Sequence, residues 1–128
     1  MFDLKVVKTE NQVSKIGRRL GISEVRVKSL IKACFLLKSS LSFLENDPLF
    51  KSFEEEALRQ LIIANKILYE MKDVFILMPV KYKIEIFKIE MLLLKFSFPK
   101  PLGQKRNRDK IKALILIIEK RILKYKVC

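Results

Sequence analysis

The stretch VSKIGRRLGISEVRVKSLIK, residues 13–32, joins two short amphipathic helical patterns at a single glycine, Gly21. The second pattern follows Ser23, a residue type that commonly caps the start of a helix. Apolar residues repeat at three- and four-residue steps on both sides of this junction, at Ile16, Leu20, Val27, Leu30 and Ile31. The stretch therefore predicts two helices that meet at a tight corner.

Two glycines explain how such a corner forms. Gly17 has no side chain that would hold the second helix away from the first. Gly21 can adopt the left-handed conformation that ends a helix and reverses the chain at little steric cost. Ile22 then fills the inside of the corner.

The same residues resemble the helix-turn-helix unit of DNA-binding regulators. That unit has a small residue in its first helix, a glycine four residues later, and apolar residues six and nine positions beyond the glycine. Gly17, Gly21, Val27 and Leu30 occupy these positions, and the resemblance is limited to residues 13–32. It implies that the helix after Ser23 lies in the major groove of DNA, while the preceding helix crosses the backbone.

The resemblance also implies a role for individual side chains. Ser23 caps the second helix at the DNA surface. The side chains that would face base edges are Glu24, Val25, Lys28, Ser29 and Lys32. Those placed for phosphate contacts are Lys15, Arg18 and Arg19.

A packing role for the same hairpin is the alternative. Glycine and serine can turn a helical hairpin in any all-α protein, and residues 1–12 form only a short segment of mixed pattern in front of it. The apolar stripe of the second helix also continues well beyond the corner, through Cys34, Leu37, Leu41 and Leu44. Both interpretations are compatible with the sequence.

The composition favours an all-α protein. The chain has 128 residues, of which 50% are hydrophobic and only three are glycine and four proline. This length is typical of one domain, and the long segments between turn residues are rich in helix-forming types. We expect one compact bundle of about five helices over residues 1–128, with residues 53–128 serving for packing or dimerisation.

The remaining helices follow from caps and prolines. The corner helix should run to about Glu45, before Pro48. Ser52 and Glu55 have the spacing of a capping box at the start of the next helix. Further helices are expected at residues 53–77, 80–98 and from the basic stretch to about residue 127, while residues 2–7 fit a helix or a strand equally well.

The formal charge of +13 points to a polyanionic partner, with duplex DNA expected first. Residues 1–37 carry 8 Lys and Arg against 3 Asp and Glu, residues 38–74 carry 5 against 7, and residues 75–128 carry 14 against 4. One basic stretch, residues 104–112, follows Pro101 and Gly103 and contains Lys105, Arg106, Arg108, Lys110 and Lys112. We expect a flexible loop there that contacts phosphates, with a solvated connector as the alternative.

The sequence offers little for catalysis or metal binding. It contains no histidine, and its two cysteines, Cys34 and Cys128, lack metal-ligand spacing. It also lacks a glycine-rich phosphate loop and a GxSxG pattern. We therefore expect no enzymatic activity, no metal and no cofactor, and we expect Cys34 to lie in the core.

The chain shows no secretory signal pattern and no apolar run long enough for a membrane span. We expect a soluble, cytoplasmic protein associated with nucleic acid. Its His-free composition, rich in Lys, Ile and Glu, is typical of thermophile proteins.

The sequence thus predicts a small basic DNA-binding protein, most simply a helix-turn-helix transcriptional regulator. Such regulators commonly bind two half-sites, which favours a homodimer. The alternative is a structural nucleoprotein, viral for instance, that coats nucleic acid through backbone contacts alone. Membrane-surface binding by the basic last helix is a third interpretation.

Overall fold

The computed structural model describes residues 10–46, 51–95, 102 and 104–127, and these residues form helices without any strand. The helices are α2 (Glu10–Leu20), α3 (Glu24–Asn46), α4 (Lys51–Glu70), α5 (Lys72–Leu77), α6 (Lys83–Lys95) and α7 (Lys105–Leu116). A 3₁₀ turn, Val80–Tyr82, precedes α6, and a π-helical segment, Ile117–Leu123, extends α7. The all-α prediction is confirmed.

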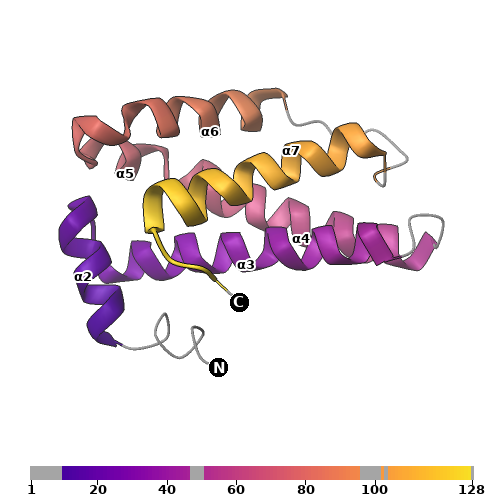
Figure 1. Cartoon of the computed structure of the whole chain (residues 1–128), viewed down its shortest axis with the longest axis horizontal. Helices are drawn as coiled ribbons and strands as arrows, with labels where there is room; N and C mark the ends of the chain where they lie inside the picture. Colours follow the sequence, from indigo (N-terminus) through magenta and orange to yellow (C-terminus); the bar gives the residue numbers. More distant parts are fainter. Residues whose placement is uncertain (1–9, 47–50, 96–101, 103, 128) are drawn as a thin grey trace.

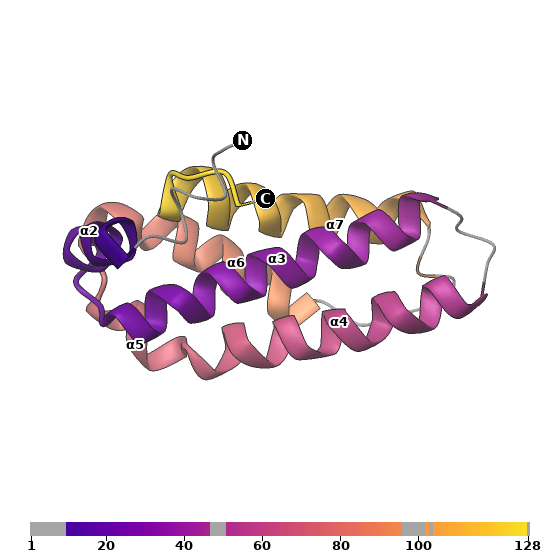
Figure 2. The ribbon, with the colours of Figure 1, turned by 90° about the horizontal axis from the view of Figure 1, so that it is seen from below.

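The long helices α3 and α4 form an antiparallel pair, and α6 and α7 lie over them (Figure 1). Helix α2 crosses one end of this bundle beside α5, and the view in Figure 2 shows the same arrangement. Helix α7 starts at the opposite end and runs back towards α2. The last helical segment therefore lies beside the N-terminal corner.

Helix α3 is the centre of the core. The predicted stripe is buried at Val27, Leu30, Cys34, Leu37 and Leu44, whereas Leu41 is half-buried. Three alanines, Ala33, Ala57 and Ala64, are fully buried. Small side chains of this kind let the backbones of packed helices approach each other closely.

The prediction of a single helix over residues 53–77 is wrong, because this segment forms two helices. Helix α4 ends at Glu70, Met71 forms a turn with its N–H bonded to the Leu68 carbonyl at 3.1 Å, and α5 starts at Lys72. The break allows Val74 and Phe75 of α5 to be buried. Since α4 begins at Lys51, Ser52 lies inside the first turn and not at the predicted cap position.

The helix predicted after Pro79 is confirmed. Pro79 precedes the 3₁₀ turn, and α6 continues from it without a strand. The prediction for residues 2–7 lies outside the described part of the chain, as does Cys128.

The predicted end of the last helix at residue 127 is wrong. The π-helical segment ends at Leu123, and Lys124 takes a left-handed conformation with φ 58°. The following residues leave the helix, and Val127 returns to the core, where it is buried. None of the helices in the described ranges has the length and apolar character needed to cross a membrane.

Candidate nucleic-acid interface

The predicted corner between α2 and α3 is confirmed in detail. Gly21 has φ +71°, which is the left-handed conformation that ends α2. The Ile22 N–H donates to the Gly17 carbonyl at 3.0 Å, and a Cβ atom on Gly17 would lie 2.9 Å from the Ile22 carbonyl oxygen. A side chain at position 17 would therefore force the corner apart.

Ser23 fixes the start of α3. Its hydroxyl oxygen accepts the Arg26 N–H at 3.4 Å, and its carbonyl accepts the Val27 N–H at 3.1 Å. Both are the expected roles of a residue at the N-cap. The first turn of α3 is therefore held by its own cap and by the corner behind it.

The outer side of α3 is open. The side chains predicted to face base edges are exposed at Glu24, Val25, Lys28 and Lys32, and half-buried at Ser29. The Ser29 hydroxyl donates to the Val25 carbonyl at 3.1 Å. Its single hydrogen is thus used, and its oxygen can only accept a further hydrogen bond. Arg26, which the sequence analysis did not select, is also exposed in the same turn.

The three cations of α2 fall into two groups. Lys15 and Arg18 are exposed, as a phosphate contact would require, whereas Arg19 is half-buried. Its guanidinium donates to the Tyr82 hydroxyl at 2.6 Å and to the carbonyls of Ile122 and Leu123 at 2.8 and 2.7 Å.

The phosphate role predicted for Arg19 is therefore replaced by a structural one. Carbonyl groups at the C-terminal end of a helix lack intrahelical partners and carry partial negative charge. The Arg19 guanidinium supplies donors and positive charge to the end of the π-helical segment. It joins the N-terminal corner to the last helical residues of the chain.

This junction brings a second set of cations towards α2. The Tyr125 hydroxyl also donates to the Gln12 side-chain oxygen, which holds the residues after the last helix against α2. The exposed cations of this region are Lys120, Arg121, Lys124 and Lys126. The sequence does not indicate that they lie near this interface, because about a hundred residues separate them from α2.

The basic stretch at residues 104–112 is not the predicted loop. Lys105 begins α7, with Gln104 at the cap position, so these cations lie on the first helical turns. Lys105 and Arg106 are exposed, and Arg108 and Lys110 are half-buried. The stretch lies at the opposite end of the bundle from α2 (Figure 1).

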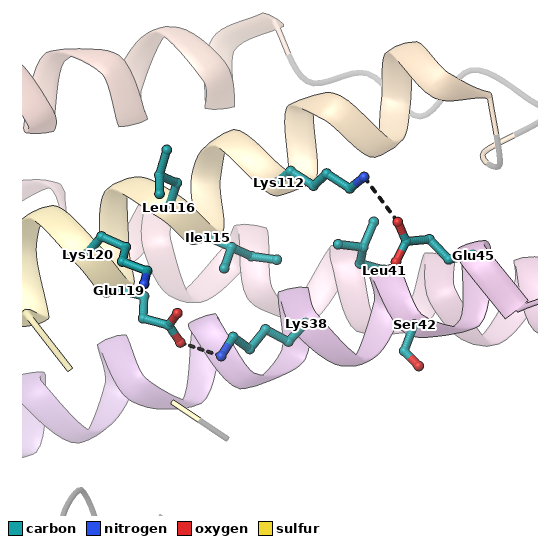
Figure 3. A pocket seen from close by; sticks show the side chains of 9 residues that line it. All are labelled: Lys38, Leu41, Ser42, Glu45, Lys112, Ile115, Leu116, Glu119 and Lys120. Atoms are coloured by element: carbon teal, nitrogen blue, oxygen red, sulfur yellow. Dashed lines mark ion pairs between the residues drawn. The ribbon is translucent and has the colours of Figure 1, made fainter. Parts of the chain in front are cut away.

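A groove of about 540 Å³ separates α3 from α7 (Figure 3). Lys112 pairs with Glu45 at 3.1 Å across it, and Lys38 pairs with Glu119. Because four of its five charged side chains are paired with each other, the groove has little charge left for a polyanion. Lys112 is thus engaged within the protein, unlike its predicted role.

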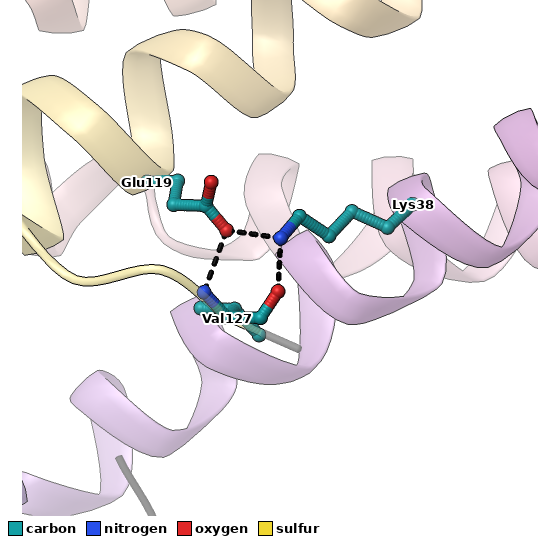
Figure 4. Close-up of polar contacts among 3 residues, drawn as sticks. All are labelled: Lys38, Glu119 and Val127. Carbon is teal, nitrogen blue, oxygen red and sulfur yellow. Dashed lines mark hydrogen bonds and ion pairs between the residues drawn. The ribbon is translucent and has the colours of Figure 1, made fainter. Parts of the chain in front are cut away.

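Glu119 organises the inner end of this groove (Figure 4). It is buried, it pairs with Lys38, and its carboxylate accepts the Val127 N–H at 2.6 Å. The Lys38 ammonium in turn donates to the Val127 carbonyl. The ion pair between the buried Glu119 and the half-buried Lys38 thereby fixes the end of the described chain to α3.

Cys34 lies in the core, as predicted. Burial, followed by the nearby Glu119 carboxylate, raises the pKa of its thiol to about 12, although Lys38 opposes the shift. The thiol is therefore protonated at neutral pH and is a structural apolar group.

The two ends of the bundle thus differ. The α2–α3 end combines a fixed corner, an open helix face and two sets of exposed cations, whereas among the described side chains the other end carries its exposed cations at the start of α7. No known protein family, curated protein or solved structure matches the chain.

Proposed function

We propose that the chain is a small DNA-binding protein, a transcriptional regulator of helix-turn-helix type. In this proposal the first turns of α3 enter the major groove of duplex DNA and α2 lies across the backbone. The formal charge of +13 supports a polyanionic partner.

The observation that carries the proposal is the exposure of Lys28 and Lys32. A packing role for the hairpin would cover this face of α3 with later helices. Both lysines are exposed instead, together with Glu24 and Val25, directly after a corner that fixes their position. Lysine can donate to guanine O6 and N7, and glutamate can accept from cytosine N4.

The cations that flank this face make the phosphate contacts in this proposal. Lys15 and Arg18 are exposed on α2, and Lys124 directly follows Leu123, whose carbonyl accepts a hydrogen bond from Arg19. Arg19 is left out, because its donors are engaged within the protein. Contacts of this kind position a protein on the duplex without carrying sequence information.

A non-specific nucleoprotein is the second candidate, and the cations on α7 favour it. Lys105 lies 18 residues before Leu123, and this separation corresponds to roughly 27 Å along a helix. Exposed cations therefore lie at both ends of the bundle. A protein that coats nucleic acid needs such a distribution and does not need a reading helix.

Selection of binding sites from random duplex DNA separates the two candidates. A regulator should yield a preferred sequence, and Lys28→Ala should reduce the preference by roughly 1–3 kcal/mol per lost base contact while sparing weak binding to random DNA. The matched control, Lys105→Ala, removes the same charge at the other end and should weaken both kinds of DNA alike.

The salt dependence of binding provides the second measurement. Affinity should fall steeply as salt rises, because each neutralised phosphate releases counterions. Binding without any sequence preference would exclude the regulator and leave the nucleoprotein. No binding even at low salt would exclude both.

A further inference from the structure

Large apolar side chains lie exposed along one edge of the bundle, on α5, the 3₁₀ turn and α6. They are 61 to 80% exposed, and we call them the α5–α6 surface: Ile76, Leu77, Val80, Ile84 and Phe87. Soluble monomers rarely expose apolar patches larger than a few hundred Å². The α5–α6 surface is therefore a candidate interface.

The spacing along α6 indicates what covers it. On α6, Ile84, Phe87 and Met91 follow one another at steps of three and four residues, which is the spacing of the heptad seam of paired helices, and Val80 precedes them in the 3₁₀ turn. Met91 is half-buried, whereas Ile86 and Ile89 on the other side of α6 are buried in the core. One face of α6 thus packs inside the bundle, and a second apolar face points out of it.

We propose that the α5–α6 surface joins two copies of this chain. The two α6 helices lie antiparallel across a two-fold axis next to Phe87. Such an interface is self-complementary, because the same surface serves both copies.

The charges beside the seam fit this register. Lys83 and Glu90 are seven residues apart on the same flank of α6, and both line a hollow of about 230 Å³ next to Phe87. With the axis between Ile86 and Phe87, Lys83 of one copy lies opposite the partner's Glu90, and the symmetric pair forms as well. On the other flank, the same register places Lys88 level with the partner's Glu85 and Lys81 level with the partner's Leu92.

The exposed area is close to what a dimer needs. A standard interface buries about 800 Å² per partner, of which about 65% is apolar in homodimers, or roughly 520 Å². Five side chains at about 100 Å² each supply about 500 Å² of apolar surface. The α5–α6 surface can therefore form the centre of a stable interface without further elements.

The interface borders the α2–α3 corner. A Cβ atom on Gly21 would lie 3.6 Å from the Leu77 carbonyl oxygen, so the end of α5 touches the turn before α3. A dimer would hold two α3 starts in a fixed arrangement. The inference itself does not depend on DNA binding, and its test uses protein alone.

Sedimentation equilibrium of the full chain, from about 1 to 100 µM, tests the proposal in a range where micromolar dissociation constants are measurable. We expect a dimer, and we expect Phe87→Glu or Ile84→Glu to raise its dissociation constant about tenfold or more. Ile62→Glu on α4 is the control, because it places the same charge at an exposed apolar position outside the α5–α6 surface and should leave the dimer intact. Circular dichroism verifies that each variant is folded.

A charge exchange tests the register. Lys83→Glu alone and Glu90→Lys alone should each weaken the dimer, and the double variant should restore it, because the opposite charges face each other again. A monomer at every concentration would overturn the proposal, as would equal effects of Phe87→Glu and Ile62→Glu. Failure of the double variant to restore the dimer would overturn the antiparallel register.

Discussion

Replacing Arg19 with methionine should destabilise the fold while leaving the DNA-facing surface in place. Methionine keeps an unbranched apolar stem but removes the guanidinium, and with it three hydrogen bonds to Tyr82, Ile122 and Leu123. Hydrogen bonds from charged groups contribute about 1.5–3 kcal/mol each when buried. Since Arg19 is only half-buried, we take about 1 kcal/mol for each bond and expect a loss of about 3 kcal/mol.

Urea unfolding followed by circular dichroism measures this loss directly. With a slope of about 2 kcal/mol per molar urea, a loss of about 3 kcal/mol lowers the unfolding midpoint by about 1.5 M. Arg18→Met is the matched control, because Arg18 is the preceding residue on α2 and is exposed. Its effect on the free energy of unfolding should stay within about 0.5 kcal/mol.

The same pair of variants should behave in the opposite way in DNA binding. Arg18→Met should lower the affinity and reduce the slope of log K against log salt by about 1, as expected for one lost phosphate contact. Arg19→Met, measured where it is folded, should leave that slope unchanged. Equal urea midpoints for the two variants, or a loss of slope with Arg19→Met, would refute the structural role of Arg19.

Further variants test the corner, the core thiol and the ion pair between Lys38 and Glu119. Gly17→Ala should lower the free energy of unfolding by about 1–3 kcal/mol, because its Cβ would lie 2.9 Å from a backbone carbonyl oxygen. Gly21→Val should lower it by about 1–2 kcal/mol or more, because valine is strained at φ +71°. Thermal melting measures both losses, with the exposed Lys15→Ala as the control, and an unchanged Tm would contradict the corner geometry. In a Cys128→Ser background, Cys34 should react with iodoacetamide at pH 8 only as fast as the chain unfolds, and urea should release the reaction. The pKa of Cys34 is raised from 9.0 to about 12, so the thiol ionises in the unfolded chain at a lower pH than in the folded chain. The free energy of unfolding should therefore carry the full contribution of Cys34 below pH 9 and decline as pH rises from 9 towards 12. Cys34→Ala should lack this decline. Glu119→Leu should cost about 1–3 kcal/mol in urea unfolding, because it leaves the buried Val127 N–H without its acceptor and removes the carboxylate that pairs with Lys38. Glu45→Leu, at the exposed end of the groove, should cost less than about 1 kcal/mol.

The corner could be predicted from the sequence because its causes are local. Gly17, Gly21 and Ser23 lie within seven residues, and each acts on the backbone next to it. The apolar steps of α3 also reflect a regular helix period, which a sequence displays directly. The exposure of Lys28 and Lys32 could not be predicted in this way, because it depends on where the later helices pack.

The parts that were missed depend on distant partners. The role of Arg19 is decided by carbonyls 103 and 104 residues away, and no local pattern indicates them. The break at Met71 has neither glycine nor proline to mark it and results from the burial of Val74 and Phe75. The start of α7 at Lys105 was assigned to a loop because Pro101 and Gly103 directly before it are residues that break helices.

The Arg19 junction also bears on the order in which the chain folds. The bond from Ile22 to Gly17 closes a loop of five residues, and loops of this size close in well under a microsecond. The bond from Arg19 to Leu123 closes 104 residues, and the entropy of loop closure delays contacts of such separation. During synthesis from the N-terminus, we therefore expect the α2–α3 hairpin to form early and to remain undocked until the residues of the π-helical segment have emerged from the ribosome.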